Sequence, residues 1–355
     1  MSGDAEISKV RLLFVKPKHI GDSLLSTPAL TATRAAFPAA EIWVVVRHGC
    51  EGILAGCPAI DQLLTTAPAE SAHRAPVAWL ADLRLILRLR RQHFDYAFEL
   101  GDNPRGRWLV WLSGARQRVA TSVASRPDWL ARQAITRFSD TNWLDRHRAE
   151  KDFLLVNEVL HLGQPVPPLA FDLQRTAAWA PAAALREFVV LHPGTRWLRK
   201  QWPIEQWIAL GRWLQGRGLA LVISSGPDAD ERELAGRLQT ALGASVLNTD
   251  GRTSWAELAG LLVRARLLVG VDTAAMHLAA ACQCPTVALF GPSVVHFWRP
   301  WRVAHRVVMP AAALAAQAAP DYLSRVANLS AETIPLADVQ AACEELLAVP
   351  VAVPA

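Results

Sequence analysis

The sequence predicts an α/β fold of two successive doubly wound parallel sheets with a cleft between them. Short apolar runs rich in β-branched residues alternate with segments of helical periodicity, as in parallel sheets that helices cover on both faces. The alternation forms two series, and stretches rich in Gly, Pro and Ala at 163–168 and 176–184 separate them. The length of 355 residues also favours two domains. We expect an N-terminal domain over residues 1–175 and a C-terminal domain over residues 176–355.

In the N-terminal series, apolar runs predict the strands and amphipathic periodicity predicts the helices. The expected strands span 11–15, 41–46, 60–64, 94–100 and, as a short one, 119–120. The expected helices span about 24–35, 79–91 and 149–161. Pro28 either lies in the first turn of the first helix or kinks it. The stretch 122–147 is rich in Arg and Trp, has weak periodicity and predicts no element.

The C-terminal series continues the same alternation. The expected strands span 188–191, 219–224, 245–247, 267–271 and 286–290, with an edge strand at 303–308. The expected helices span 204–215, 230–242, 254–265, 273–281 and 335–347. The strand at 267–271 is an uninterrupted apolar run, which is typical of a strand buried on both faces.

Composition excludes several classes of protein. With 52% hydrophobic and 19% charged residues, the chain can bury large cores and does not resemble a disordered protein. The sequence has no apolar run near the ~20 residues that a transmembrane helix needs, and residues 1–10 lack the apolar region of a signal peptide. We therefore expect a cytosolic protein. The five cysteines are scattered without C-x-x-C spacing, which favours buried thiols over a zinc site.

The net charge of +5 suits an anionic ligand or an anionic surface. Its distribution argues against a nucleic-acid partner, because no block of Lys and Arg interleaves with aromatic residues. The sequence also lacks G-x-G-x-x-G and G-x-x-x-x-G-K-[ST]. The absence of the first motif counts against a dinucleotide-dependent dehydrogenase.

A first candidate site follows the strand 267–271. Asp272 and Thr273 come directly after this strand, and His277 lies in the helix that follows. Ligands of open α/β sheets bind at the carboxyl ends of strands, and a helix N-terminus favours anions. The alternative is that Asp272 only caps the helix and His277 only packs in the core.

A second candidate site is the loop HPGTRWLRKQWP at 192–203. Gly194 allows close approach of the backbone, and Thr195 offers a hydroxyl. The loop also carries three cations, Arg196, Arg199 and Lys200. This composition suits a diphosphate, although a solvated basic loop is the alternative.

The loop after the strand 11–15 holds a third candidate, Asp22. It lies near three basic side chains, Lys16, Lys18 and His19. A carboxylate in such a loop can serve as a general base or simply as a helix N-cap, and the spacing does not choose between them.

A D-x-D pattern occurs at Asp228 and Asp230. Such a pattern can hold a divalent metal for a nucleotide sugar. It also lies at the entry of an expected helix, where the dipole favours acidic residues. We favour helix capping and expect no metal site and no cofactor.

Three segments together resemble the signatures of the heptosyltransferase family of lipopolysaccharide core biosynthesis, glycosyltransferase family 9. They are KPKHIGDSLLSTPAL at 16–30, HPGTRWLRKQWP at 192–203 and VDTAAMHLAAACQCPTVALFGPS at 271–293. The segment LSGARQRV at 112–119 is also similar. The K-x-K-H-x-G-D form of the first segment favours the heptosyltransferase III branch.

The resemblance implies a GT-B fold, in which two Rossmann-like domains face each other across a cleft. The N-terminal domain would bind the acceptor and the C-terminal domain the nucleotide sugar, and the last helix, about 335–347, would return to the N-terminal domain. The implied reaction is inverting, metal-independent transfer of heptose from ADP-L-glycero-D-manno-heptose to a lipopolysaccharide inner-core acceptor. Two alternatives remain: a related transferase with another nucleotide sugar, and a non-catalytic module that binds a nucleotide or glycan.

Position by position, the resemblance assigns roles to these residues. Asp22 matches the catalytic base, and Lys200 matches the lysine that neutralises the donor phosphates. The implied donor-binding set is Gly194, Thr195, Arg196, Lys200, Glu231, Asp272, Thr273, Ala274 and His277. The implied acceptor-binding set is Lys16, Lys18 and His19. Ala274 stands where the family pattern has Gly, and either Asp230 or Glu231 can be the acidic donor contact.

A lipid-anchored acceptor would bring the protein to an anionic membrane surface without spanning it. The expected helix 79–91 lies in the acceptor half and carries Arg84, Arg88, Arg90 and Arg91. These cations are candidates for peripheral contact with the inner membrane. The alternative is a helix packed on the sheet by its Leu and Ile face, with solvated arginines.

Overall fold

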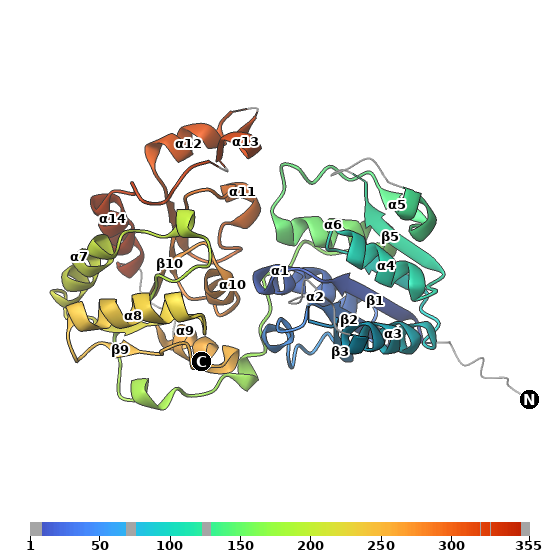
Figure 1. Cartoon of the computed structure of the whole chain (residues 1–355), viewed down its shortest axis with the longest axis horizontal. Coiled ribbons are helices and arrows are strands. Elements are labelled where there is room, and N and C mark those ends of the chain that lie inside the picture. The colour runs from blue at the N-terminus through green and yellow to red at the C-terminus, as the bar shows by residue number, and fades with distance from the viewer. Residues whose placement is uncertain (1–8, 69–75, 123–128, 320, 327, 349–355) are drawn as a thin grey trace, which may run out of the picture. The chain divides into compact units, whose positions relative to one another are not determined.

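The computed structural model describes residues 9–68, 76–122, 129–319, 321–326 and 328–348. The chain forms two compact units that divide between Asp172 and Leu173, close to the domain boundary expected after residue 175. Each unit contains a six-stranded parallel sheet with helices packed against it (Figure 1). The predicted α/β class with two doubly wound sheets is confirmed.

The sheet of the first unit has the strand order β3-β2-β1-β4-β5-β6. Its strands are β1 (Arg11–Lys16), β2 (Glu41–Val46), β3 (Gln62–Thr65), β4 (Tyr96–Glu99), β5 (Gln117–Thr121) and β6 (Arg137–Ser139). Its helices are α1 (Ile20–Leu25), α2 (Thr27–Ala36), the short η1 (Glu51–Ile53), α3 (Pro76–Arg90), α4 (Pro104–Leu112), α5 (Trp129–Ala134) and α6 (Arg148–Leu160). The chain moves outward from β1 in both directions, so the topological switch point lies between β1 and β4.

Local sequence explains where elements of the first unit begin and end. Pro28 lies in the first turn of α2, as one of the two sequence alternatives predicted, and α1 ends just before Ser26. The helices α4 and α5 and the strand β6 were not predicted. In β6 only Ser139 is fully buried, so this edge strand lacks the apolar run that marks β1 and β2.

The sheet of the second unit has the strand order β12-β11-β10-β7-β8-β9. Its strands are β7 (Phe188–His192), β8 (Ala220–Ile223), β9 (Leu247–Asn248), β10 (Leu267–Val271), β11 (Thr286–Leu289) and β12 (His305–Val308). Its α-helices are α7 (Ile204–Gln215), α8 (Ala229–Leu242), α9 (Trp255–Arg264), α10 (Ala274–Ala281), α11 (Val295–Trp298), α12 (Ala311–Gln317), α13 (Tyr322–Val326) and α14 (Leu336–Leu347). Three short 3₁₀ turns are η2 (Leu173–Arg175), η3 (Ala180–Ala182) and η4 (Leu198–Lys200). Here the switch point lies between β7 and β10.

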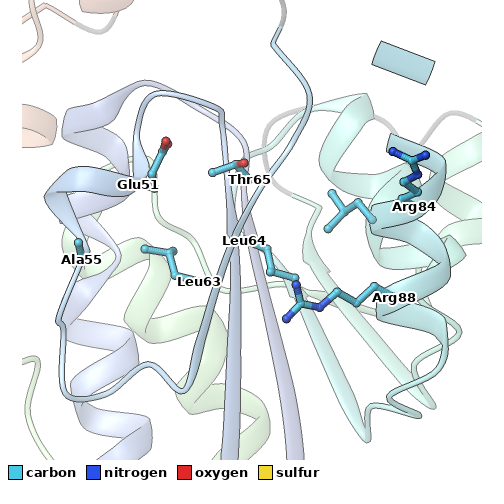
Figure 2. A pocket seen from close by; sticks show the side chains of 8 residues that line it. Glu51, Ala55, Leu63, Leu64, Thr65, Arg84 and Arg88 are labelled. Atoms are coloured by element: carbon cyan, nitrogen blue, oxygen red, sulfur yellow. The ribbon is translucent and has the colours of Figure 1, made fainter. Parts of the chain in front are cut away.

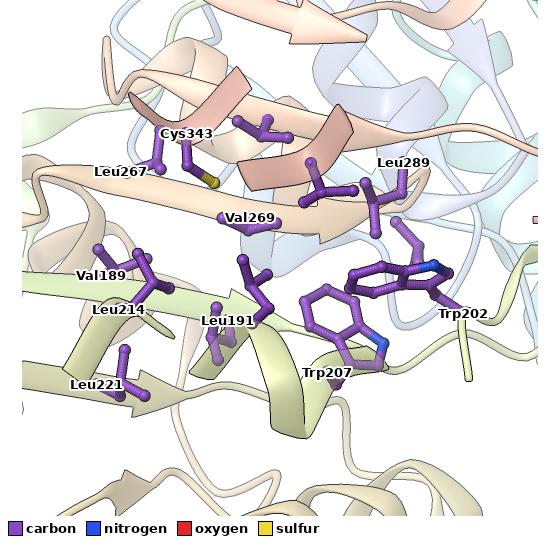
Figure 3. Packing of buried hydrophobic residues seen from close by; sticks show 14 of the residues in the cluster. Val189, Leu191, Trp202, Trp207, Leu214, Leu221, Leu267, Val269, Leu289 and Cys343 are labelled. Carbon is purple, nitrogen blue, oxygen red and sulfur yellow. The ribbon is translucent and has the colours of Figure 1, made fainter. Parts of the chain in front are cut away.

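A buried cluster on one face of this second sheet contains two tryptophans (Figure 3). The rings of Trp202 and Trp207 meet edge to face with centroids 5.2 Å apart. The indole N–H of Trp202 donates to the carbonyl of Ile334 at 2.9 Å, so it remains satisfied although the ring is buried. This bond also ties the loop after β7 to the segment before α14.

The last helix, α14, packs within its own unit. It packs against β10, β11, β12 and α7 of its own unit. Its apolar face, which includes Val339, Cys343 and Leu346, belongs to the buried cluster of the second sheet. This packing uses the apolar stripe of α14, and the expected return of the last helix to the N-terminal domain stays a prediction.

Two further expectations concern composition. All five cysteines lie in described parts of the chain, and each is a buried thiol, as predicted. Among the described residues, no helix has the length and apolar character needed to cross a membrane.

Candidate active site

The switch point of the second sheet brings Lys200 and Asp272 together. Lys200 lies in η4 of the loop after β7, and Asp272 follows the last residue of β10. The Lys200 Nζ donates to Asp272 Oδ2 at 2.6 Å and approaches the Asp272 carbonyl oxygen at 3.2 Å. Because Asp272 is only 7% exposed, its charge needs this partner. The family resemblance placed both residues in one donor-binding set, and the structure shows them in direct contact.

The Asp272 carboxylate does not cap the following helix. The N-cap of α10 is Thr273, and Asp272 Oδ2 instead accepts a second hydrogen bond, from Ser293 Oγ at 2.6 Å. Ser293 lies in the loop after β11 and was not predicted as a site residue. The capping alternative for Asp272 is therefore wrong.

The beginning of α10 completes this side of the site. Thr273 and Ala274 are half-buried, whereas His277, one turn into the helix, is buried. The Thr273 hydroxyl oxygen is buried and has no hydrogen-bond partner among the described residues. A buried hydroxyl without a partner is costly, so it is suited to receive a ligand at this helix N-terminus.

Glu231 packs against two glycines, one of which lies in the loop after β7, and neither position has room for a Cβ atom. A Cβ at Gly194 would lie 2.6 Å from Glu231 Oε2, and a Cβ at Gly226 would lie 2.8 Å from the same oxygen. Gly226 N donates to this oxygen at 3.0 Å. Burial raises the pKa of Glu231, whereas Asp230 is exposed. Of the two acidic candidates, Glu231 is thus the one beside the loop.

The D-x-D pattern caps a helix. Asp228 is the N-cap of α8, and its side chain accepts a hydrogen bond from Asp230 N at 3.1 Å. The capping interpretation is confirmed. The described residues contain no group of three or more His, Cys, Asp or Glu side chains that could hold a metal ion.

The remaining residues of the loop 192–203 divide into buried and exposed. Thr195 is buried, and its hydroxyl oxygen accepts a hydrogen bond from Trp197 N at 3.3 Å. Arg196 and Arg199 are exposed. The backbone carbonyl of Arg199 accepts a hydrogen bond from Ala331 N, and this bond connects the loop to the segment before α14. The alternative of a solvated basic loop therefore agrees with the exposure of the two arginines, but it does not explain the contact of Lys200 with Asp272.

A buried histidine lies beneath this loop. His192 ends β7, and its Nδ1 lies 2.8 Å from the hydroxyl of Ser224 at the end of β8. Burial lowers the pKa of His192 to about 4, so its imidazole is neutral near pH 7. The buried hydroxyl of Ser225, the residue after Ser224, has no hydrogen-bond partner among the described residues. His192 begins the predicted loop, but none of these three residues was assigned a role in the site.

In the first unit, the switch point holds Lys16. Its Nζ donates to Asp152 Oδ2 at 2.5 Å and to the carbonyl of Leu100 at 2.9 Å, and the residue is 4% exposed. Burial lowers the pKa of Lys16, but the carboxylates of Asp152, Asp22 and Asp102 raise it above its usual value. Lys16 was expected to contact the acceptor; the structure shows it bridging β1, the loop after β4 and α6.

The residues that follow Lys16 are more accessible. Lys18 is half-buried, and His19 is exposed and forms the N-cap of α1. Asp22 is the third residue of α1 and is half-buried. The N-cap alternative for Asp22 is therefore wrong, and its charge acts on the buried Lys16.

A second buried ion pair lies beside the first. Lys151 pairs with Asp102, and Glu99 accepts hydrogen bonds from the backbone N–H groups of Gly101 and Asp102 at 2.9 and 3.1 Å. Burial, together with the charge of the nearby Asp102, raises the pKa of Glu99 to about 7. So many charged groups in one buried place are typical of a functional site.

Comparison with known proteins decides the family. A sequence model of glycosyltransferase family 9 (heptosyltransferase) matches residues 83–324. The chain belongs to glycosyltransferase family 9.

Two curated relatives and one solved structure illustrate this membership. Lipopolysaccharide heptosyltransferase 1 of Pseudomonas aeruginosa is 31% identical over 297 residues, which cover 80% of this chain and 79% of the relative. Lipopolysaccharide heptosyltransferase 3 of Escherichia coli is 28% identical over 289 residues, which cover 79% and 83%. The structure of E. coli heptosyltransferase WaaC with ADP has a TM-score of 0.75 at 21% identity, over 95% of this chain and 100% of that chain. The protein is a glycosyltransferase with the GT-B fold, as its motifs implied.

The three motifs of this family 9 glycosyltransferase begin where strands end. The segment 16–30 starts at the end of β1, 192–203 at the end of β7, and 271–293 at the end of β10. All three strands border a topological switch point, where ligands of doubly wound sheets bind. A polar residue at the carboxyl end of a buried strand is itself a sign of such a site. This sign could have identified His192 and Ser224 from the sequence.

Proposed function

We propose that this glycosyltransferase moves heptose from ADP-L-glycero-D-manno-heptose to an inner-core acceptor of lipopolysaccharide. The observation that carries the proposal is the partly buried contact between Lys200 and Asp272 at the β7/β10 switch point. It places a fixed cation beside a helix N-terminus, in a member of the heptosyltransferase family. The names of the relatives supply the sugar and the acceptor, and ADP is the nucleotide in the WaaC structure.

The donor would lie over the carboxyl ends of β7 and β10. Lys200 and Arg196 would neutralise the diphosphate, and Thr195, Thr273 and the amides that begin α10 would donate hydrogen bonds to it. Fixed cations of this kind can take the place of a metal ion, so the transfer would be metal-independent.

Other donor contacts follow from the same geometry. Glu231, whose carboxylate packs against Gly194 of the loop, would accept hydrogen bonds from donor hydroxyl groups. Ala274 and His277, at the start of α10, would line the donor-binding site on that side. Asp272 would hold Lys200 in position.

The first unit would hold the acceptor and the base. Asp22 would take the proton of the acceptor hydroxyl while the hydroxyl oxygen attacks the anomeric carbon. The bond from that carbon to the phosphate oxygen breaks, ADP leaves with the electron pair, and the configuration inverts. Lys18 and His19, beside Asp22, would contact the anionic acceptor, whereas Lys16 supports them from the interior.

Because the acceptor carries a lipid anchor, we further propose that the protein works at the cytoplasmic face of the inner membrane as a peripheral protein. The form of the first loop favours a heptosyltransferase III acceptor. The identities to relatives numbered 1 and 3 are similar, so this choice depends on that loop alone.

A thermal-shift screen of nucleotide sugars tests the donor. A ligand at a hundred times its Kd stabilises the folded state by about 2.7 kcal/mol, which raises Tm measurably. We expect ADP-heptose and ADP to raise Tm, and UDP- and GDP-sugars to have little effect. Lys200→Ala should reduce the shift, whereas Arg212→Ala in α7 should leave it unchanged. A shift with UDP- or GDP-sugars but not with ADP-heptose would assign another donor.

A further inference from the structure

The helix α3 of the first unit is apolar on two sides. Leu85 and Leu89 are buried against the sheet, and Ile86 packs against the same cluster. On the outer side, however, Leu80 and Leu83 are 51% and 50% exposed. A surface helix normally presents polar residues outward, so this outer face is exceptional.

The exposed apolar side chains form one continuous stripe. Trp79, Leu80, Leu83 and Leu87 are separated by helical spacings, and their exposed fractions range from 45% to 62%. They make up four of the eleven large apolar side chains that are exposed in the described residues. Such clustering on one helix marks a binding surface rather than scattered surface residues.

Arginines flank this stripe. Arg84 and Arg88 are exposed and follow the stripe along one side of the helix, and the exposed Arg91 comes directly after its last residue. The only acidic residue of α3, Asp82, is turned away from it and pairs with Arg105 of α4 at 3.0 Å. The outer face of α3 therefore combines exposed apolar groups with positive charge and contributes no carboxylate.

A hollow of about 530 Å³ lies next to this face, between α3 and the edge strand β3. Leu63, Leu64 and Leu85 supply its apolar wall, and Arg88 extends across it toward Leu64 (Figure 2). Arg84 also lines it, and Glu51 lies on the side of η1. A hollow lined by two arginines and an apolar wall suits a molecule with an anionic head and an apolar tail.

We propose that the outer face of α3 and this hollow form a docking surface for an anionic lipid bilayer. The leucines and Trp79 enter the interface between headgroups and acyl chains, and the arginines bind lipid phosphates. The combination of apolar and cationic groups selects a bilayer over a purely polar partner. The reason for docking, a lipid-anchored acceptor, rests on the proposed function. The assignment of the surface rests only on the exposed side chains of α3 and on the hollow.

Vesicle co-sedimentation of the full chain tests the proposal. The probes are phosphatidylcholine vesicles with and without phosphatidylglycerol, at low and high salt. Two variants separate the contributions: Leu83→Ser with Leu87→Ser, and Arg84→Gln with Arg91→Gln. Arg88 stays intact because it bonds to Gln62 and lies over the Trp43 ring. The matched control is Leu314→Ser with Leu323→Ser, two exposed leucines of the second unit.

The parent should bind the phosphatidylglycerol vesicles. The leucine variant should bind them at least tenfold more weakly at both salt concentrations. The arginine variant should lose about tenfold at low salt and approach the parent at high salt, where charges are screened. The control should bind like the parent, and all variants should keep the parental Tm.

The proposal would be overturned if the leucine variant bound the vesicles as well as the parent, or if the control lost as much binding as the leucine variant. It would also be overturned if the parent bound no vesicles and instead formed a dimer in sedimentation velocity that the leucine substitutions abolished. Transfer to a lipid-free, water-soluble acceptor should persist in every variant. If the parent docks but transfers no sugar to that acceptor, the proposed function fails while the docking surface stands.

Discussion

The Nζ of Lys200 lies 2.6 Å from Oδ2 of Asp272, and Ser293 Oγ donates to the same oxygen at the same distance. One carboxylate oxygen thus joins the loops after β7, β10 and β11. A cation held in this way is oriented before any ligand arrives, which is what stabilisation of a leaving group requires.

This arrangement predicts that Ser293 acts through Lys200. Lys200→Ala should lower kcat/KM by at least about 10²-fold, and Ser293→Ala by about tenfold, because a hydrogen bond to a charged group contributes roughly 1.5–3 kcal/mol. In the Lys200→Ala background, Ser293→Ala should have almost no further effect. Steady-state kinetics of the four proteins provides the measurement. Full additivity of the two losses would show that Ser293 acts independently.

Asp22 is predicted to be the general base. Asp22→Asn should lower kcat by about 10²–10⁴-fold, the usual range for such catalysis, with donor affinity nearly unchanged. Asp230→Asn is the matched control, because both residues are acids in the first turn of a helix. Kinetics and calorimetric titration of the donor check this. A fully active Asp22→Asn enzyme would remove Asp22 from the mechanism.

Metal independence is a further expectation. Lys200 and Arg196 would supply the charge that a metal supplies elsewhere, and Asp228 is occupied as a helix cap. Activity should therefore survive EDTA, measured by ADP release in the presence of acceptor. If activity disappears and Mg²⁺ or Mn²⁺ restores it, the D-x-D residues become candidate ligands after all.

Glu99 predicts a dependence of stability on pH. Its folded-state pKa of about 7 lies above the unfolded value of 4.5. The unfolded chain releases this proton first as pH rises, so the contribution of Glu99 to stability is complete below about pH 4.5 and falls, by about 3 kcal/mol in total, as pH approaches 7. Glu99→Gln stays neutral, so the stability of the variant relative to the parent should increase between about pH 4.5 and pH 7 and level off above that range. Urea denaturation measures this, and a difference that does not change with pH would contradict it.

The sequence predicted the local elements well and the long-range contacts poorly. The strand 267–271 and the helix 204–215 coincide with β10 and α7, because apolar runs and helical periodicity are local signals. The contact between Lys16 and Asp152 joins residues 136 positions apart, and no local pattern announces it. This is why the buried ion pair of Lys16 was not predicted, and why Glu99 and Lys151 were not considered.

The candidate site divides in the same way. Motifs identified Lys200, Asp272 and Glu231, but the hydrogen bond between Ser293 and Asp272 depends on how β10 and β11 align. The position of α14 could not be read from its own amphipathic pattern, since that pattern shows which face is buried but not against which sheet.

Direct transfer of heptose tests the central claim. The protein would be incubated with ADP-L-glycero-D-manno-heptose and a heptose-deficient lipopolysaccharide core acceptor in EDTA, and the acceptor would be analysed by mass spectrometry and NMR. The account predicts the gain of one heptose with an inverted anomeric centre, and no gain with Asp22→Asn in the same time. Transfer from another nucleotide sugar in place of ADP-heptose, or retention of the anomeric configuration, would contradict it.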